Sequence, residues 1–236
     1  MEQVVTLLTP TGARPSAFAL CEKWFRNQTI HTNPKYKIQW LCVDDYAKEP
    51  TNFTCNQIKV AAPKQWTPEI NTQRYNLDAL MEKATGDIIV NWEDDEYYAP
   101  EYLEEMVKLL GMAQIAGISN DRYYHIKAKG YKLIGNWRHA SLCRTVIRKE
   151  IKNLLYQSVH SGQYYFDIDL WTRVREKEIP MNLIAHASLS VGIKGMPGRA
   201  GLGAVHAIVG YANDKTLDKF KEWVGRDWES YTPYLK

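Results

Sequence analysis

Several features that would place this chain in a special class are missing from its 236 residues. No apolar run approaches the roughly 18 residues of a membrane-spanning helix, and residues 1–10 lack the basic segment of a secretory signal. Repeats and low-complexity tracts are also missing. The cysteines show no C-x-x-C or other metal-binding spacing: Cys21, Cys42, Cys55 and Cys143. We therefore expect a cytoplasmic chain with reduced thiols and no membrane span.

A strong excess of one charge is missing too. The 30 Lys and Arg residues and the 27 Asp and Glu residues give a net charge of +3, and 45% of the residues are hydrophobic. This composition excludes a disordered or collagen-like chain and is ordinary for a folded domain. The 15 Tyr and 8 Trp residues outnumber the 5 Phe. Aromatic rings with a polar group suit clefts that hold sugars or bases, and they also occur in ordinary cores.

Strand and helix patterns alternate in the first half of the chain. Short apolar runs predict strands over 4–8, 38–43, 58–61 and 88–92. Helical spacing of apolar residues predicts helices from residue 16, over 77–84 and over 102–110. This order indicates an α/β fold, a mostly parallel sheet with helices on both faces. Ligands bind beyond the carboxyl ends of the strands in such sheets, so the loops at 9–14, 44–45 and 93–96 predict one site.

The second half mixes its elements differently. We expect a β-hairpin over 122–134 with its turn near residue 130, strands over 141–147 and 183–193, and helices over 167–177 and 217–224. A glycine-rich stretch, 195–203, follows the last of these strands.

Four consecutive acidic residues, Glu93 to Glu96, follow a predicted strand. Like charges at this spacing repel one another unless a cation neutralises them. On an extended chain Glu93 and Asp95 point the same way and Asp94 points opposite. Carboxylate oxygens are the ligands that Mg²⁺ and Mn²⁺ prefer, so the run predicts a site for one of these ions. The alternative is a solvated acidic turn ahead of a helix that begins near Pro100.

The segment from Ala84 to Asp95 resembles the metal-binding segment of the GT-A glycosyltransferases of family 2. Three other segments agree with that family in order and spacing: Thr9-Pro10-Thr11, Val43-Asp44-Asp45 and Arg74-Tyr75-Asn76. The chain differs from the family at Glu93, where Asp is usual, and at Tyr46, where Gly is common. The resemblance implies one GT-A domain over 1–236, with a Rossmann-like nucleotide-sugar half, 1–112, and an acceptor half of mixed strands, 113–236.

The resemblance also implies roles for single residues. Asp95 would bind Mn²⁺ or Mg²⁺ at the diphosphate of a nucleotide-sugar donor, a UDP-sugar in our prediction, and Glu93 would lie near the ribose or a metal-bound water. A late histidine, His206, would be a second metal ligand. An aspartate would read the base. The predicted nucleotide-binding residues are Thr9, Pro10, Thr11, Arg14, Asp44, Asp45, Arg74, Asn76, Glu93, Asp94 and Arg199.

A second acidic pair, Asp167 and Asp169, begins the helix predicted over 167–177. Inverting members of the family carry a general base near this position, and Asp167 matches it. Such a base is needed because the acceptor hydroxyl must lose its proton as it attacks the anomeric carbon. Asp169 is the second candidate. The alternative is that both residues only stabilise the helix N-terminus.

Residues 122–149 contain eight Lys and Arg residues and no acid, with Tyr and Trp interleaved. Cations for phosphates and aromatic rings for bases are typical of nucleic-acid surfaces. The segment equally fits an ordinary solvated hairpin. The chain also has a looser likeness to phage glycosyltransferases that act on hydroxymethylated pyrimidines in DNA, which would place it in the host cytoplasm.

Three functions therefore remain open. The first is a metal-dependent, inverting glycosyltransferase acting on modified DNA, or on a saccharide or surface glycan. The second is a metallonuclease that uses the acids at 93–96, which leaves the loops at 9–11 and 44–45 without a role. The third is a binding module without catalysis. Oligomeric state is not indicated by the sequence.

Overall fold

The computed structural model describes residues 2–185, 189–201 and 203–235. Its larger sheet contains seven strands in the order β10-β6-β9-β4-β1-β2-β3. The bounds are β1 (Gln3–Thr11), β2 (Tyr36–Asp44), β3 (Ile58–Val60), β4 (Ile88–Asn91), β6 (Ile115–Ile118), β9 (Thr145–Arg148) and β10 (Met181–Ile184). Strands β4, β1, β2 and β3 run parallel, whereas β9 is antiparallel to both β4 and β6. The predicted mostly parallel α/β sheet is confirmed.

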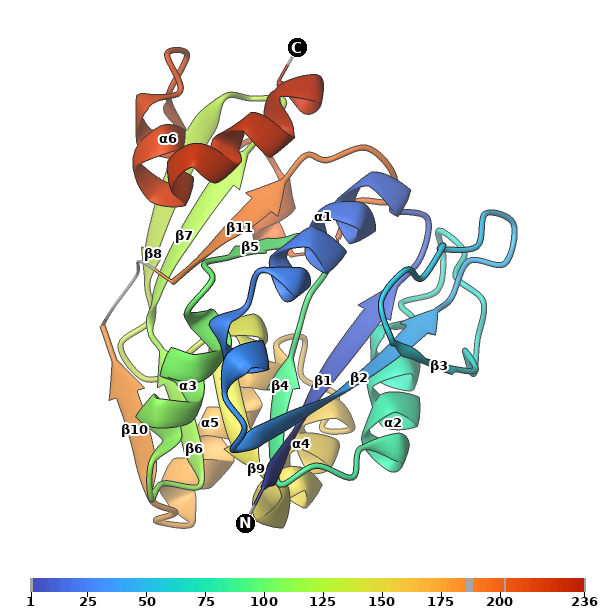
Figure 1. The fold of residues 1–236 in the computed structure, drawn as a ribbon, viewed down its shortest axis with the longest axis vertical. Coiled ribbons are helices and arrows are strands. Elements are labelled where there is room, and N and C mark those ends of the chain that lie inside the picture. Colours follow the sequence, from blue (N-terminus) through green and yellow to red (C-terminus); the bar gives the residue numbers. More distant parts are fainter. Residues whose placement is uncertain (1, 186–188, 202, 236) are drawn as a thin grey trace.

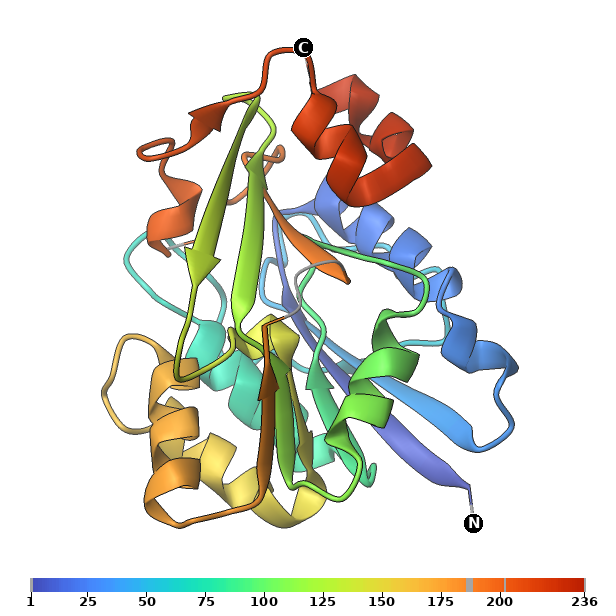
Figure 2. The ribbon, with the colours of Figure 1, turned by 90° about the vertical axis from the view of Figure 1, so that its left-hand side faces the viewer.

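Helices cover both faces of this sheet (Figures 1 and 2). One face carries α1 (Pro15–Arg26) and α3 (Tyr102–Leu110), and the other carries α2 (Gln73–Lys83), α4 (Lys152–Val159) and α5 (Phe166–Glu176). β1 is buried on both faces, because Val5 and Leu7 belong to one core and Leu8 to the other. Burial of alternate side chains in two cores explains why this strand appears in the sequence as a continuous apolar run.

A smaller five-stranded sheet has the order β12-β8-β7-β11-β5. Its strands are β5 (Glu96–Tyr98), β7 (Asn120–His125), β8 (Gly130–Gly135), β11 (Ser190–Lys194) and β12 (Ala212–Asn213). The C-terminal helix α6 (Asp218–Val224) packs against it, with the rings of Phe220 and Tyr124 stacked at 4.2 Å. The predicted hairpin over 122–134 is the β7–β8 pair.

Two predicted strands have different bounds. The run 183–193 is not one strand: β10 joins the larger sheet beside β6, and β11 joins the smaller one beside β7. Residues 186–188 of that run lie outside the described residues. The strand predicted over 141–147 begins only at Thr145, because a 3₁₀ turn over Leu142–Arg144 turns the Arg144 side chain into the interior.

The division at residue 112 does not separate two structural units. Strands β6, β9 and β10 from the second half complete the larger sheet, and β5 from the first half forms an edge of the smaller one. As a division of labour between donor and acceptor it stays a prediction. Within the described residues, no helix combines the length and the apolar character that crossing a membrane requires.

Candidate active site

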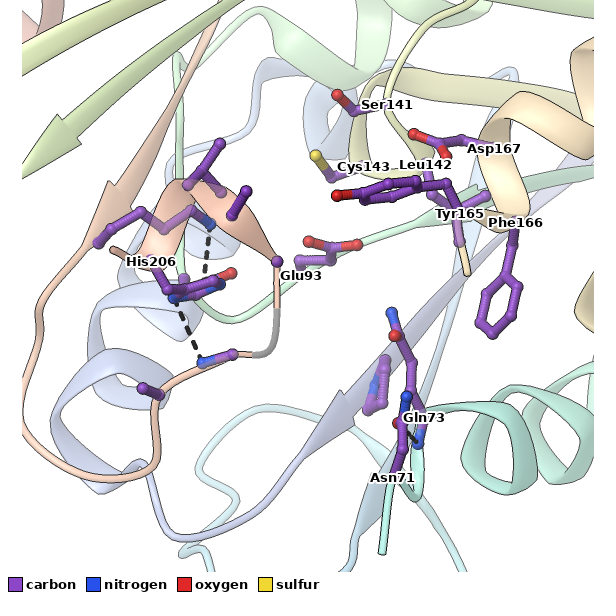
Figure 3. Close-up of a pocket in the computed structure, with 18 of the residues that line it drawn as sticks. Asn71, Gln73, Glu93, Ser141, Leu142, Cys143, Tyr165, Phe166, Asp167 and His206 are labelled. Carbon is purple, nitrogen blue, oxygen red and sulfur yellow. Dashed lines mark hydrogen bonds and ion pairs between the residues drawn. The ribbon is translucent and has the colours of Figure 1, made fainter. Parts of the chain in front are cut away.

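A pocket of about 620 Å³ lies where the carboxyl ends of β1 and β4 meet the smaller sheet. Figure 3 shows Asn71 and Gln73 at one end, Glu93 in the middle and Asp167 at the other end. The predicted acidic run and the predicted base therefore share one cavity, although 70 residues of chain lie between Glu96 and Asp167. Of the three loops predicted to form one site, 9–14 and 93–96 contribute side chains to the pocket wall, whereas 44–45 does not.

The acids of the run are separated by their partners. The Asp94 carboxylate accepts a hydrogen bond from Arg14 Nη1 at 2.7 Å on one oxygen and another from Thr11 Oγ1 at 2.7 Å on the other oxygen. Lys194 Nζ lies 2.9 Å from Asp95 Oδ2 and 2.9 Å from Glu96 Oε1. Burial would lower the pKa of Lys194, but the charges of Asp95 and Glu96 outweigh it and raise that pKa. The chain itself thus supplies cations to three of the four acids.

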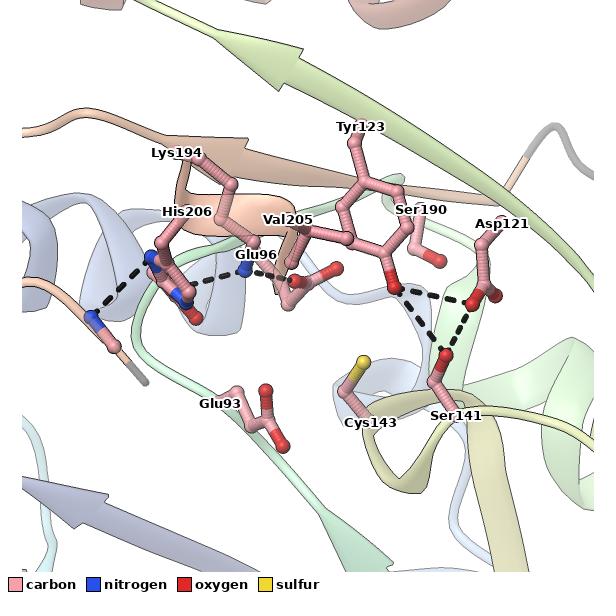
Figure 4. A network of polar contacts seen from close by, with 12 residues as sticks. Glu93, Glu96, Asp121, Tyr123, Ser141, Cys143, Ser190, Lys194, Val205 and His206 are labelled. Atoms are coloured by element: carbon pink, nitrogen blue, oxygen red, sulfur yellow. Dashed lines mark hydrogen bonds and ion pairs between the residues drawn. The ribbon is translucent and has the colours of Figure 1, made fainter. Parts of the chain in front are cut away.

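Arg144 extends this arrangement toward the end of the pocket that contains Asp167, which we call the acceptor end. Its guanidinium lies 3.1 Å from Glu96 Oε2 and 3.0 Å from Asp121 Oδ1, and all three side chains are almost completely buried. Asp121 also accepts hydrogen bonds from Tyr123 Oη and Ser141 Oγ (Figure 4). The ion pairs therefore form a continuous row of alternating charges: Asp121, Arg144, Glu96, Lys194, Asp95, Arg14 and Asp94. Lys194, Arg144 and Asp121 come from three separate segments, and no local sequence pattern predicted them as site residues.

Glu93 differs from its neighbours because none of the ion pairs among the described residues involves it. Its Oε1 accepts a hydrogen bond from Asn91 Nδ2 at 2.8 Å. Burial, together with the charges of Asp95 and Glu96, raises the pKa of Glu93 to about 8. Glu93, Glu96 and Cys143 also form a group whose possible ligand atoms lie within 4.8 Å of one another. The buried Cys143 thiol, whose pKa is raised by burial, does not suit a hard cation.

His206 lies beside Asp95, with its Nε2 3.7 Å from Asp95 Oδ2. Burial and the nearby charge of Lys194 lower the pKa of His206 to about 4, so the ring is neutral at pH 7. A neutral imidazole is the form that ligates metals. Its Nδ1 accepts the Gly201 N–H at 3.3 Å, so Nε2 carries the proton, and ligation through Nε2 would require the other tautomer.

The charge balance of the pocket fits a divalent cation. The row contains four carboxylates and three cations, so it carries one negative charge before Glu93 is counted. A nucleoside diphosphate adds further negative charge and needs a positive partner. The carboxylates of Glu93 and Asp95 are the hard oxygen donors that Mg²⁺ and Mn²⁺ prefer. Thus these residues fit the ion that the sequence predicts.

Several predicted nucleotide-binding residues do not line the pocket. Thr9 Oγ1 donates to the Trp92 carbonyl, and Thr11 supports Asp94. Asp44 accepts the backbone N–H groups of Tyr46 and Thr51, so it closes its own loop. These side chains are buried because the polar ends of the parallel strands need local hydrogen-bond partners. They position the loops of the site and do not reach its cavity.

Asp45 and Arg74 are also placed differently from the prediction. Asp45 is completely buried: Arg199 Nη1 lies 2.8 Å from its Oδ1, and Asn76 Nδ2 donates to its Oδ2. Arg74 is exposed and points to the Tyr75 hydroxyl, away from the pocket. For Asp45 to hydrogen-bond the base of the nucleotide, its ion pair with Arg199 would have to break first.

Other side chains line the base end in their place. Pro10, Asn76 and Arg199, all predicted, lie in the wall beside Trp66, over whose ring the Arg199 guanidinium stands at 5.2 Å. Asn76 Oδ1 is buried and has no hydrogen-bond partner. Arg199 is held there because its backbone N–H donates to the Ala13 carbonyl. Leu202, in the predicted glycine-rich stretch, lies outside the described residues.

The acceptor end contains Asp167 but not Asp169. Asp167 lines the pocket near Tyr165 and Ser141 (Figure 3), and burial raises its pKa above the ordinary value. Asp169, two residues and so about half a helical turn further along α5, is paired with Arg173 at 2.5 Å and is not part of the pocket wall. The i,i+4 pair keeps the Asp169 carboxylate on the outer surface of α5.

The basic residues of 122–149 do not form one surface. Arg144 is buried in the row of charges, and Arg148 and Lys149 lie at the opposite end of β9, bound to the Gly111 carbonyl and to Asp87. Partly exposed apolar side chains instead line the pocket near Asp167: Tyr165 and Ile168 are close to half exposed, and Trp137, which is 93% exposed, follows the lining residue Asn136 in the chain. The segment is therefore not the continuous basic patch that its composition suggests.

A family model described as "Glycosyl transferase family 2" matches residues 21–167, which is more than half of the chain. The chain belongs to glycosyl transferase family 2. The GT-A resemblance is confirmed, and the family model covers the acidic run and ends at Asp167. No curated protein matches the sequence of this family 2 member.

Solved structures share the fold of this family 2 chain at low identity. The mannosyltransferase PcManGT of Pyrobaculum calidifontis, in complex with GDP-Man and Mn²⁺, is 13% identical with a TM-score of 0.54, and the match covers 84% of this chain and 58% of that one. S. aureus TarS 1–349 in complex with UDP is 11% identical with a TM-score of 0.53, covering 82% and 60%. The same protein with UDP-GlcNAc gives 11% and 0.51, covering 89% and 62%. These likenesses establish the fold, and the chain spans about three-fifths of each neighbour.

Proposed function

We propose that this chain transfers a sugar from a UDP-sugar to an acceptor hydroxyl with inversion at the anomeric carbon. The observation that carries the proposal is the single pocket that contains both the acidic run and Asp167. The run at Glu93 to Glu96 lies beside the carboxyl ends of the parallel strands, where ligands of such sheets bind. A donor lying there would present its sugar toward Asp167.

In this proposal Asp95 and Glu93 hold Mn²⁺ or Mg²⁺, with His206 as a further ligand. The ion, when bound, stabilises the charge that develops on the departing diphosphate. Arg14 and Lys194 line the same pocket and would add positive charge near the phosphates. The Mn²⁺ in the PcManGT complex supports an ion of this type in this fold.

Asp167 is the proposed general base, and Asp169 is not retained because Arg173 holds its carboxylate. Asp167 takes the proton of the acceptor hydroxyl as the acceptor oxygen bonds to the anomeric carbon. The bond from that carbon to the phosphate oxygen breaks, and its electron pair leaves with the nucleoside diphosphate. Burial raises the pKa of Asp167 and so makes its carboxylate a stronger base than an exposed one.

At the end of the pocket near Trp66 and Asn76, one observation favours uridine or guanosine over cytidine, and we keep uridine as the proposal. Asn76 Oδ1 is an unpartnered acceptor in the pocket wall, and its amide is held by the hydrogen bond to Asp45. A carbonyl oxygen accepts the ring N–H of uracil or guanine, whereas cytosine offers an acceptor at the same ring position. Complexes of TarS with UDP and of PcManGT with GDP-Man are compatible with this reading.

For the acceptor, we propose a hydroxymethylated base in phage DNA, and a saccharide or surface glycan is the alternative. The exposed Trp137 ring suits stacking on either a base or a sugar face, and Arg138 beside it is exposed and cationic. A metallonuclease is less well supported, because Asp94 and Glu96 are already paired with arginines and cannot hold a second metal ion.

The test is a transfer assay with Mn²⁺, UDP-, GDP- and CDP-sugars, and three acceptors: plain DNA, DNA with hydroxymethylated pyrimidines, and an oligosaccharide mixture. Mass increase of one acceptor by one sugar residue, with UDP-sugar as the donor, supports the proposal. Cleavage of DNA without sugar transfer would replace it by the nuclease. Binding of UDP without turnover of any acceptor in a complete panel would favour a binding module.

A further inference from the structure

Lys194 and Arg14 both line the pocket and each contacts two neighbouring carboxylates of the acidic run, but only Lys194 lies close to both of its partners, because Arg14 lies 2.7 Å from Asp94 and 3.7 Å from Asp95. The Lys194 side chain is 4% exposed, and its Nζ lies 2.9 Å from Asp95 Oδ2 and 2.9 Å from Glu96 Oε1. Figure 4 shows Lys194 beside Glu96. Lys194 lines the pocket, whereas Arg144 does not. Lys194 is thus placed where both a metal ion and a donor phosphate would lie in the proposed function.

Asp95 and Glu96 depend on Lys194 to different degrees. Glu96 keeps Arg144 at 3.1 Å if the lysine moves. Asp95 would keep the neutral His206 ring at 3.7 Å and one charged partner among the described residues, Arg14, whose guanidinium is also 3.7 Å away and is bound more closely to Asp94 at 2.7 Å. The contact between Lys194 and Asp95 is therefore the link in the row that can be exchanged without leaving Glu96 unpaired.

We propose that Lys194 occupies Asp95 in the metal-free protein and moves to the donor diphosphate when a divalent cation takes its place. This inference rests on the proposed function. Two cations in contact with one carboxylate oxygen repel each other by several kcal/mol at an effective dielectric constant of about 20. A cation at Asp95 therefore requires the ammonium to withdraw, and a diphosphate arriving with the cation gives the ammonium a new partner.

The exchange makes metal and donor binding cooperative. Bare Mn²⁺ must displace Lys194 without compensation and so binds weakly. With UDP present, the displaced ammonium pairs with phosphate, and Mn²⁺ binds more tightly. By linkage, Mn²⁺ tightens UDP binding by the same factor.

The experiment measures free Mn²⁺ by electron paramagnetic resonance during titration of the full chain, with and without UDP. In the wild type we expect UDP to tighten Mn²⁺ binding at least about tenfold. Lys194→Met should tighten bare Mn²⁺ binding by about tenfold and lose most of the effect of UDP, because the competing charge and the phosphate partner are both removed. Lys194→Arg keeps the charge and should resemble the wild type in bare Mn²⁺. The exposed control Lys221→Met should match the wild type in all measurements.

A purely structural lysine gives a different pattern. In that case Lys194→Met would lower the melting temperature without tightening the binding of bare Mn²⁺. Bare Mn²⁺ binding that is unchanged or weaker in the folded variant overturns the inference. If Lys194→Met does not fold, the wild type decides: Mn²⁺ binding that is independent of UDP overturns it. UDP binding that needs no Mn²⁺ refutes both the exchange and the metal at the acidic run, but leaves the pocket standing as a UDP site. Absence of both UDP and Mn²⁺ binding refutes the inference and the proposed function together.

Discussion

The guanidinium of Arg144 and the carboxylate of Glu96 form an ion pair of 3.1 Å in which each side chain is only 1% exposed. The same guanidinium binds Asp121, so one arginine neutralises an acid next to the proposed metal site and an acid at the acceptor end. A buried charge without a partner is costly. The pair therefore connects the stability of the fold directly to the geometry of the active site.

Arg144→Met is expected to reduce the free energy of unfolding by about 3–5 kcal/mol, because it leaves Glu96 and Asp121 buried with fewer partners. Urea unfolding followed by circular dichroism measures this loss. Lys149→Met is the matched control: Lys149 pairs with Asp87 at 2.6 Å but is about half exposed, so its loss should cost about 1 kcal/mol or less. Equal effects of the two substitutions would show that the buried row does not stabilise the fold.

Glu93 should make the metal-free protein less stable as the pH rises. Its pKa is about 8 in the folded chain and 4.5 by its ordinary value, so between these pH values the folded state holds a proton that the unfolded state has lost. The free energy of unfolding should then fall by up to about 1.4 kcal/mol per pH unit from this group. Unfolding in EDTA at several pH values measures the slope.

Glu93→Gln removes this titration and should flatten the slope between pH 5 and 8. Saturating Mn²⁺ should also reduce the slope in the wild type, because a bound cation favours the ionised carboxylate. An identical pH dependence in the wild type and in Glu93→Gln would mean that Glu93 is ionised in the folded protein at neutral pH.

Asp167→Asn is expected to lower kcat by about 10²–10⁴ while UDP binding stays near that of the wild type, because the amide keeps the shape but accepts no proton. Asp169→Asn loses its pair with Arg173 on the outer surface of α5 and should cost far less activity. Steady-state kinetics and UDP titrations distinguish the two variants. A crippled Asp169→Asn beside an active Asp167→Asn would reverse the assignment.

Much of the fold follows from the sequence because its main strands are continuous apolar runs. Val5, Leu7 and Leu8 are buried in two cores, and this pattern is visible without a structure. The run 183–193 was misleading because apolar character does not tell which of two sheets a strand joins. Helix α4 was missed although Leu154, Leu155 and Val159 give it a buried face.

The site was less predictable than the fold. Proximity in the sequence indicated the acidic run, but its partners Lys194, Arg144 and Arg14 come from three distant segments that only the folded chain brings together. The position of Asp45 could not be read either, because its burial depends on Arg199 in the glycine-rich stretch. Local patterns identify candidate groups, and the choice among them depends on tertiary contacts.

If DNA is the acceptor, binding should weaken with salt with a log–log slope of about −0.9 per phosphate neutralised. Arg138→Ala, at an exposed position beside Trp137, should reduce that slope by about one and leave UDP binding intact. The triple substitution of Lys127, Lys129 and Lys132 by Ala tests whether the β7–β8 hairpin also contacts phosphates. Fluorescence anisotropy with hydroxymethylated DNA at several salt concentrations measures the slope for the wild type and for both variants. Binding that is insensitive to salt, or undetectable, would favour a saccharide acceptor.

The most direct test of the donor site is a calorimetric titration of UDP into the wild type and into Asp95→Ala, each with Mn²⁺ and with EDTA. We predict that the wild type binds UDP at least about tenfold more tightly with Mn²⁺, and that Asp95→Ala remains folded and loses this difference. Wild-type binding that is equal in Mn²⁺ and EDTA, or a Mn²⁺ effect that survives in Asp95→Ala, would contradict a metal-assisted donor site at the acidic run.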